Sequence, residues 1–387
     1  MLAKAEQLKP RLVEIRRAIH RHPEPGFEVH QTAGLVARTL AECGARCQTG
    51  VGKTGVVGLL GNSNGPVVAI RADMDALPIQ ETNKVVYASQ VPGIMHACGH
   101  DAHTAMLLGA VMLLANEKLA GEVRFLFQPS EEAFDKQGFS GATAMLADHA
   151  LEGADAIIAL HVTGTLDTGK IEISPGVGSA AVDTFKATIS GKGGHGAHPN
   201  QTIDPFWITS QVLNALYAVP SRRIDPLQPA VLSVGIVRGG SAANIIPDTV
   251  YLEGTLRSID TAVRQQLQDE VRNALEIARV MGGSYDLELE TGYPSMVNDP
   301  GVVEVIRQAA ASLLGADAVQ PDRLSMGAED FSYMAAACPG AMFNLGVRHP
   351  GQPSRFLHNP EFDIDEDALP IGAAILAEST LSLLTRL

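Results

Sequence analysis

The chain has 387 residues, of which 45% are hydrophobic and 19% are charged, and its formal net charge is −14. This length exceeds what one hydrophobic core usually serves, so we expect two domains, and the composition excludes a disordered or collagen-like chain. The negative charge opposes binding to polyanions, and we find no run of about 18 apolar residues that could span a bilayer, so neither nucleic acid nor a membrane is expected as a partner.

The cysteines and the N-terminal segment bear on where the protein works. The segment Met1–Pro10 carries charges where a signal peptide needs an apolar run. The cysteines show no spacing typical of a disulfide framework; they are Cys43, Cys47, Cys98 and Cys338. These features predict a reducing, cytoplasmic location.

The first 180 residues alternate between helical and strand-like segments. Apolar residues three and four apart predict a helix around Leu8–Ile19, which ends near His22. A second helix is expected over 32–43. Further strands are expected over 56–60, 67–70, 123–127 and 156–161, and further helices over 102–115 and 141–149. The alternation predicts an α/β domain with a largely parallel sheet.

The order of the predicted helices and strands changes near residue 182. Six elements follow in the order βαββαβ, over 182–190, 203–218, 230–237, 249–257, 260–280 and 284–291. This order matches a split-βαβ sandwich, so we expect a compact domain over 181–292. It would be inserted into a catalytic domain made of 1–180 and 293–387, the latter with a short strand over 341–345.

Three of the predicted strands deliver possible metal ligands at their carboxyl ends. Asp73 and Asp75 follow one strand, Glu131 and Glu132 follow another, and His161 ends a third. Open α/β sheets place their ligand sites at these ends. The sequence therefore predicts that these side chains converge on one site.

The segment from His96 to His103 is rich in histidine and precedes a predicted helix. Cys98 and His100 are two residues apart and can point to one side of an extended segment, with Gly99 allowing a tight bend. Thiolate and imidazole donors suit zinc and other divalent first-row metals. Taken alone, the pattern decides little, because a buried free cysteine, with Asp101 and His103 as helix-start residues, would explain it as well or better.

The pair Glu131–Glu132 strengthens the metal interpretation. Adjacent carboxylates repel each other and are costly to bury unless cations or protons compensate them. A solvated loop is the alternative, but an apolar strand and Pro129 precede the pair. One carboxylate would bind metal, and the other would stay free to take a proton from water that the metal activates.

Other candidates each allow two interpretations. His161 could be a core histidine that bonds a backbone carbonyl, and His358 is ambiguous by itself. Asp73 and Asp75 could orient ligand histidines or merely form a turn before Pro78.

Taken in order, these motifs resemble the co-catalytic metallopeptidases that include aminoacylases and carboxypeptidases. Within them, the chain is most similar to the hippurate hydrolase and auxin-conjugate amidohydrolase branch. The resemblance covers nearly the whole chain. It rests on the segments 20–24, 71–78, 96–101, 128–132, 193–195, 244–248, 327–332 and 356–360.

The resemblance implies a site with two divalent metal ions and a reaction that cleaves the amide bond of N-acyl amino acids, such as hippurate-like or N-acetyl compounds. Glu131 is the implied general base and proton shuttle. The implied ligands are Cys98, His100, Glu132, His161 and His358. The wider family has a ligand histidine near Asp73, and here the sulfur of Cys98 enters the site instead. Zinc, manganese, cobalt and nickel all remain admissible.

The resemblance also implies the architecture. A phosphorylase/hydrolase-like catalytic domain would carry an inserted ferredoxin-like domain, which acts as a lid and pairs two subunits into a homodimer, with a homotetramer as a further option. His195 would reach across the dimer to the developing oxyanion, with Asn244 assisting. Arg257 would bind the substrate carboxylate, for which a guanidinium is suited.

Three alternatives compete with this hypothesis. The same chemistry could serve a dipeptidase or carboxypeptidase acting on short peptides. Cys98 could be the nucleophile of a thiol hydrolase, activated by His100 or His103, which would be insensitive to chelators. The metals could also be structural in a binding protein, although the additional carboxylate of Glu131 is an expensive feature for such a site.

Overall fold

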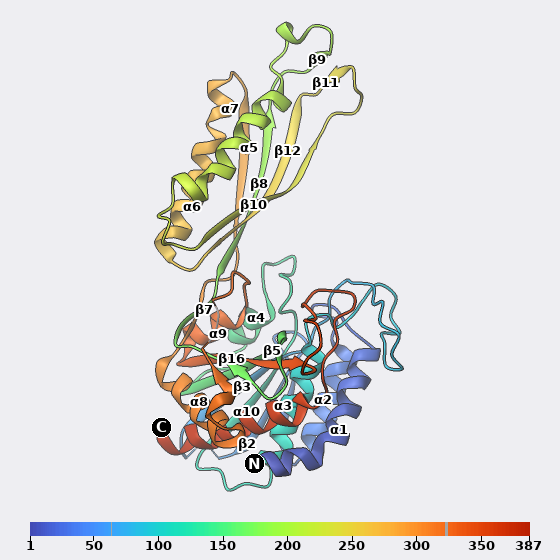
Figure 1. Cartoon of the computed structure of the whole chain (residues 1–387), viewed down its shortest axis with the longest axis vertical. Helices are drawn as coiled ribbons and strands as arrows, with labels where there is room; N and C mark the ends of the chain where they lie inside the picture. Colours follow the sequence, from blue (N-terminus) through green and yellow to red (C-terminus); the bar gives the residue numbers. More distant parts are fainter. Residues whose placement is uncertain (63, 322–323) are drawn as a thin grey trace. The chain divides into compact units, whose positions relative to one another are not determined.

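The computed structural model describes residues 1–62, 64–321 and 324–387. The chain divides into two compact units (Figure 1). Each unit has its own hydrophobic core. The first unit comprises Met1–Gly178, Val297–Arg323 and Asp330–Leu387, and the second comprises Ser179–Met296 and Leu324–Glu329. The segment Leu324–Glu329 joins the second unit because Ala180 N–H donates to Gly327 O and Ser179 pairs with Ser325.

An eight-stranded sheet runs through the first unit. Its order is β1 (Arg46–Val51), β2 (Gly55–Gly61), β4 (Glu122–Gln128), β3 (Val67–Asp73), β5 (Ala156–Asp167), β16 (Gly340–Arg348), β6 (Ile171–Glu172) and β15 (Val319–Gln320). The α/β class is confirmed, but the sheet is mixed: β4, β3, β5 and β16 run parallel, whereas β1, β2 and β4 pair antiparallel, as do β16 and β6. The prediction of a largely parallel sheet therefore holds for its centre.

Two strands differ from the sequence-based expectation. Strand β1 was not predicted, because its residues Arg46–Gly50 are exposed and form no apolar run. Strand β5 does not end at His161 but continues to Asp167, because β16 accompanies it to the Arg348–Asp167 pair. The pairing of β5 with β3 ends earlier, at Ala159, two residues before His161.

Helices cover this sheet. Three of them, α1 (Leu2–Arg21), α3 (His100–Leu114) and α10 (Ala368–Arg386), pack against one another. The others are α2 (His30–Glu42), α4 (Gly141–Ala147), α8 (Pro300–Leu314) and α9 (Phe331–Ala337). Helix α10 is long and apolar enough to cross a membrane, but 72% of its apolar window is buried within the structure, which is typical of a core helix.

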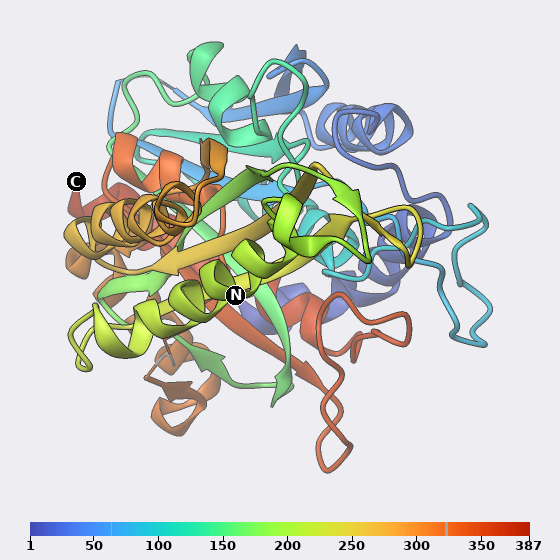
Figure 2. The same cartoon turned by 90° about the horizontal axis from the view of Figure 1, so that it is seen from above.

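The second unit is a four-stranded antiparallel sheet in the order β10 (Ala230–Gly239), β12 (Thr249–Ser258), β8 (Ala181–Ser190) and β13 (Ser284–Thr291). Helices α5 (Pro205–Arg222), α6 (Thr261–Leu275) and α7 (Ile277–Val280) lie on one side of it (Figures 1 and 2). The connectivity is the predicted βαββαβ, with the second helix divided at Glu276. Short elements complete the chain: β7 (Gly176–Ser179), β9 (Gly194–His195), η1 (Pro199–Gln201), β11 (Ile245–Ile246), β14 (Met296–Asn298) and η2 (Ala316–Ala318).

Candidate active site

The turn before α3 places a sulfur and an imidazole side by side. Gly99 has a φ of 85°, and a Cβ at this position would lie 2.4 Å from Val162 Cγ2, so a larger residue would be excluded by both conformation and space. The turn leaves Cys98 Sγ 3.4 Å from His161 Nε2 and makes His100 the first residue of α3. Donors from the turn and from β5 therefore meet.

The two glutamates are held by a strained turn and by Asp75. The residue before them, Ser130, has a φ of 45°, which is unusual for a residue with a side chain and is often found at functional sites. The Asp75 carboxylate accepts the backbone N–H groups of Glu131 at 3.0 Å and of Glu132 at 3.2 Å. Asp75 thus orients the backbone of the pair rather than serving as a ligand.

The histidines His100 and His161 each have one ring nitrogen engaged in a hydrogen bond, and His358 is held through its backbone. His100 Nδ1–H donates to Asp75 O at 2.8 Å, and His161 Nδ1–H donates to Val162 O at 2.8 Å. His358 has a φ of 59°, and its backbone N–H donates to Ala97 O at 2.8 Å, which ties its loop to the Cys98 turn. These bonds engage Nδ1 and leave Nε2 of His100 and of His161 as the atom that could bind a cation, the arrangement usual for metal-binding histidines.

The donor atoms form two groups that share one sulfur. Cys98, His100 and His161 make one triple, and Cys98, Glu132 and His358 make the other, with the donor atoms of each within 4.8 Å of one another. His358 Nε2 is 3.4 Å from Glu132 Oε1. Donors on a tetrahedral zinc ion are about 3.3–3.8 Å apart. Two cations could therefore be held with the Cys98 sulfur near both, and Glu131 lies within the same distance of His100 and Glu132.

The electrostatics of the cluster fit a bound cation. His100 Nε2 and Glu132 Oε1 are buried, 3.8 Å apart, and neither has a hydrogen-bond partner among the described residues. Burial would lower the pKa of His100, but Asp73, Asp75 and Glu132 outweigh it and raise that pKa to about 10. The cluster thus carries an excess of negative charge in a buried place, and a divalent cation would satisfy both this charge and the two atoms that make no hydrogen bond.

The same surroundings weigh against Cys98 as a nucleophile. Burial raises the pKa of its thiol well above the usual range, and the carboxylates of Glu132, Glu131 and Asp73 raise it further. A neutral, buried thiol is a poor nucleophile, whereas a bound cation would deprotonate it.

Asp73, which the sequence analysis named as a residue that could orient ligand histidines, belongs to a buried polar network next to the site; its other members, Arg71, His103 and Asp330, were not predicted to have this role. Asp73 Oδ1 accepts His103 Nδ1–H at 2.6 Å, and Asp73 Oδ2 accepts Arg71 Nη1–H at 2.6 Å. Arg71 also donates to Asp330 at 2.9 Å, and the Asp330 N–H lies 3.4 Å from Glu131 Oε1. Arg71 within an apolar strand was the available signal, because a charge there is costly unless it is paired.

The remaining predicted residues lie in the second unit. His195 and Asn244 are brought together, since β9 pairs with β11 and Gly196 N–H donates to Asn244 O at 2.8 Å. Ala197 N–H donates to His195 Nδ1 at 3.0 Å, so His195 Nε2 carries the proton and faces outward as a donor.

Arg257 lies elsewhere in that unit. It pairs with Val182 at one end of β8, whereas Thr249 pairs with Ser190 at the other end, next to β9. Eight residues of strand separate the two positions, which is roughly 25 Å at 3.3 Å per residue. Burial lowers the pKa of Arg257, and no ion-pair partner for it occurs among the described residues.

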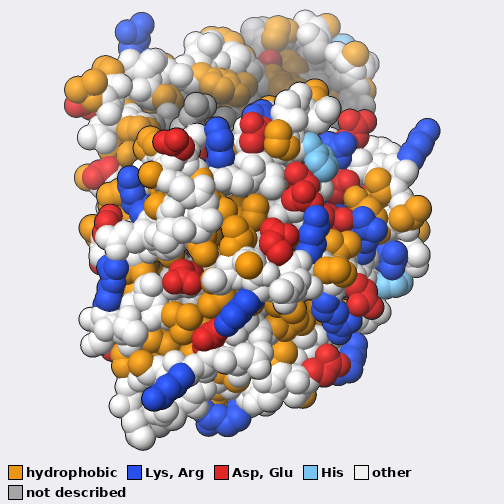
Figure 3. Space-filling model, turned by 60° about the horizontal axis from the view of Figure 1, so that its bottom comes forward, with side chains coloured by type: hydrophobic (Ala, Val, Ile, Leu, Met, Phe, Trp, Pro, Cys, Tyr) orange, Lys and Arg blue, Asp and Glu red, His pale blue; other side chains and the backbone are white. Residues whose placement is uncertain are grey.

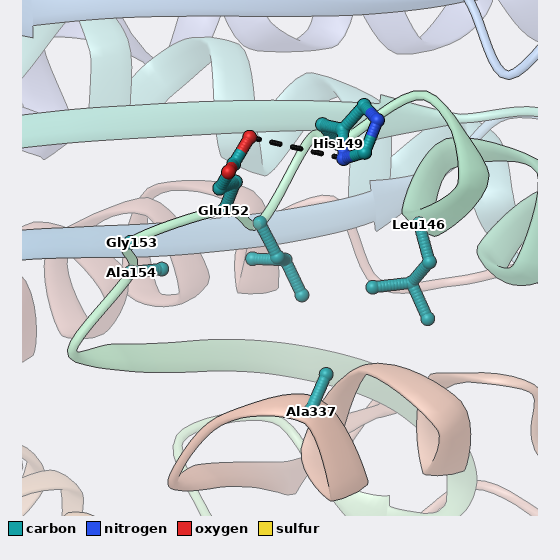
Figure 4. Close-up of a pocket in the computed structure, with 7 residues that line it drawn as sticks. Leu146, His149, Glu152, Gly153, Ala154 and Ala337 are labelled. Carbon is teal, nitrogen blue, oxygen red and sulfur yellow. Dashed lines mark ion pairs between the residues drawn. The ribbon is translucent and has the colours of Figure 1, made fainter.

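One hollow in the described part of the chain lies away from this cluster. It is shallow, lies beside Leu146, His149, Glu152 and Ala337 (Figure 4), and adjoins the start of β5, at the edge of the sheet opposite the ligands. On the face drawn in Figure 3, acidic and basic side chains are interspersed, and no basic patch forms there.

Comparisons with known proteins agree with this chemistry. Residues 69–382 match the family model described as peptidase family M20/M25/M40. The chain is 39% identical to thermostable carboxypeptidase 2 of Saccharolobus solfataricus, over 98% of this chain and 96% of that protein. It is 40% identical to the N-acetyl-L-cysteine deacetylase of Bacillus subtilis, over 97% and 89%. A crystal structure described as the YXEP protein of Bacillus subtilis, a dinuclear metal-binding peptidase, is 34% identical, with a TM-score of 0.85 over 99% and 100% of the two chains.

Proposed function

Since the chain belongs to peptidase family M20/M25/M40 and is a metal-dependent hydrolase acting on amides, we propose that it hydrolyses N-acyl amino acids. The observation that carries this proposal is the convergence of Cys98, His100, Glu132, His161 and His358, two of whose buried donor atoms make no hydrogen bond, beside the further carboxylate of Glu131.

The proposed centre holds two divalent cations, with zinc, manganese, cobalt and nickel as candidates. When bound, such cations polarise a carbonyl oxygen and make water easier to deprotonate. Glu131 takes the proton of the attacking water and later delivers it to the leaving amine nitrogen. Asp75 keeps Glu131 and Glu132 in place through their backbone N–H groups.

His195 and Arg257 complete the proposal. His195 Nε2–H stabilises the developing oxyanion, with Asn244 beside it, and Arg257 binds the substrate carboxylate. The distance along the sheet of the second unit weighs against these two residues of one chain touching the same small substrate. We therefore propose that His195 is supplied by a partner subunit in a homodimer.

The substitution Glu131→Gln tests the base. We expect amidase activity to fall by a factor of about 10² to 10⁴, because positioned proton transfer contributes that much, while both cations remain bound. Initial rates on a panel of N-acyl amino acids and the metal content of the purified protein measure the two effects. Glu152→Gln, an exposed change at the opposite edge of the sheet, is the matched control. Full activity of Glu131→Gln with metal retained would rule out this role.

Hydrolysis of short peptides is the second candidate, favoured by the similarity to a thermostable carboxypeptidase. The reaction would use the same residues, so only the substrate separates the two functions. The panel should therefore include dipeptides, each assayed after metal stripping and reconstitution with one metal at a time. We also propose a cytoplasmic location, which the four free cysteines support.

A further inference from the structure

His103 is a buried imidazole that lies between two candidate ligands without belonging to the proposed ligand set. Its ring centroid is 5.4 Å from that of His100 and 4.6 Å from that of His161. Its exposed fraction is 1%. A third imidazole packed this closely against two ligands needs a role of its own.

Hydrogen bonds occupy both nitrogens of this ring. The backbone N–H of Val162 can only donate, so His103 Nε2, at 2.9 Å, accepts. The proton of the ring therefore sits on Nδ1, which donates to Asp73 Oδ1 at 2.6 Å. His103 is a neutral imidazole with no lone pair left for a cation, and for the same reason it cannot act as a base toward Cys98.

The hydrogen bond from Val162 N–H to His103 holds in place the residue whose carbonyl oxygen orients the His161 ring. Val162 donates its N–H to His103 and accepts the Nδ1–H of His161 at 2.8 Å. Strand β3 pairs with β5 only as far as Ala159, so its backbone does not accompany β5 here. The His103 side chain supplies a hydrogen bond to β5 beyond the point where the pairing of β5 with β3 ends.

The bond to Asp73 anchors His103 to the rest of the unit. Asp73 is held in turn by Arg71, which also donates to Asp330. All four side chains are almost completely buried. His103 thereby connects β5 to the buried network behind the site.

We propose that His103 is a positioning residue. It keeps His161 Nε2 directed at Cys98 Sγ and so sets the affinity for the divalent cation that Cys98, His100 and His161 would share. This inference rests on the metal centre of the proposed function and does not depend on its substrate.

Two substitutions test the two hydrogen bonds of the His103 ring one at a time. His103→Gln can keep an acceptor near the position of Nε2 for Val162 N–H, whereas His103→Asn can keep a donor near Nδ1 for Asp73. Calorimetric titration of the metal-stripped full chain with Zn²⁺ measures affinity and stoichiometry. The visible spectrum of the Co²⁺-loaded protein reports how Cys98 and His161 surround the ion.

We expect His103→Gln to bind both ions within a few-fold of the unmutated chain and to keep its Co²⁺ spectrum. His103→Asn should bind one of the two ions about 10- to 100-fold more weakly, as for other groups that orient a ligand. Equal affinities for the two variants, or a larger loss in His103→Gln, overturn the proposal. Should His103→Asn fail to fold, an altered Co²⁺ spectrum in His103→Gln is still sufficient to overturn it.

A double-mutant cycle adds an independent check. Once His161→Ala has removed the ligand, adding His103→Asn should weaken Zn²⁺ binding no further, because the two residues act on the same ion. Additive losses would mean that His103 acts independently of His161 and would overturn the proposal. An unmutated chain that binds no cation overturns both the metal centre and this inference, whereas a lack of amidase activity alone bears only on the proposed function.

Discussion

Arg16 is a fully buried guanidinium in the first unit. It donates to Asp101 at 2.7 Å and to Asp363 at 2.9 Å, and its Nη1 lies 3.3 Å from Glu366. Burial by itself would lower the pKa of Arg16, but these carboxylates outweigh it and raise the pKa. The same arginine keeps the pKa of Asp101 far below its usual range. Asp101 adjoins His100, so this ion cluster also supports the start of α3.

We expect Arg16→Met to lower the free energy of unfolding by about 3–5 kcal/mol, because it leaves buried carboxylates without their counter-charge. Arg11→Met is the matched control on the same helix. Arg11 pairs with Glu14 at the surface, and its loss should cost under about 1 kcal/mol. Urea unfolding followed by fluorescence measures both. Equal losses in the free energy of unfolding for Arg16→Met and Arg11→Met would contradict this explanation.

At the scale of elements, Asp183 joins a strand to a helix in the second unit. It lies in β8 and accepts two bonds from Arg264 and one from Gln268, both in α6. Burial would raise the pKa of Asp183, but these bonds outweigh it and lower the pKa. A depressed carboxyl pKa stabilises the fold above the unfolded-state value of about 3.9, and the stabilisation is lost as the pH falls through the folded-state pKa.

Asp183→Asn should therefore be less stable than the unmutated chain at pH 7, and the difference should shrink as the pH falls below about 4. Melting temperatures of both proteins from pH 7 to pH 3 measure this. Asp286→Asn, an exposed change in β13 of the same sheet, should show no such convergence. A difference that stays constant with pH would show that Asp183 does not act through its charge.

At the scale of the whole molecule, the second unit carries an apolar surface that a second copy could cover. Trp207 and Tyr217 in α5 are 62% and 55% exposed, and Phe206 beside them is 43% exposed. Strand β10 lies at the edge of its sheet, with its outer hydrogen-bonding groups unpaired within the sheet. A helix and an edge strand together suit the self-complementary contact of a twofold dimer.

A mixing experiment tests whether this dimer shares its sites. His195→Ala and Glu131→Gln should each be nearly inactive alone. If His195 acts in trans, random heterodimers carry one complete site, and refolding an equal mixture should restore about a quarter of the unmutated activity. If His195 served its own chain, no site in the mixture would be complete. Replacing Trp207 by Glu should prevent dimerisation, measured by light scattering, and abolish the recovery.

The sequence by itself determined most of the helices and strands and the side chains that could bind a metal ion. Apolar periodicity marks most helices and strands, because burial of one face requires it. Cys98, His100 and the pair Glu131–Glu132 stand out because such side chains are costly without a cation. Strand β1 was not predicted, because most of its residues are exposed and its sequence therefore lacks the apolar run by which strands are recognised.

Only the tertiary structure decided how these residues act together. Cys98 and His358 are far apart in the sequence, and their meeting depends on the path of β16 and on the bond from His358 N–H to Ala97 O. The roles of His103 and Asp75 depend on hydrogen bonds to backbone groups of Val162, Glu131 and Glu132. Spacing along a chain does not encode such contacts, because they arise when separate segments fold against one another.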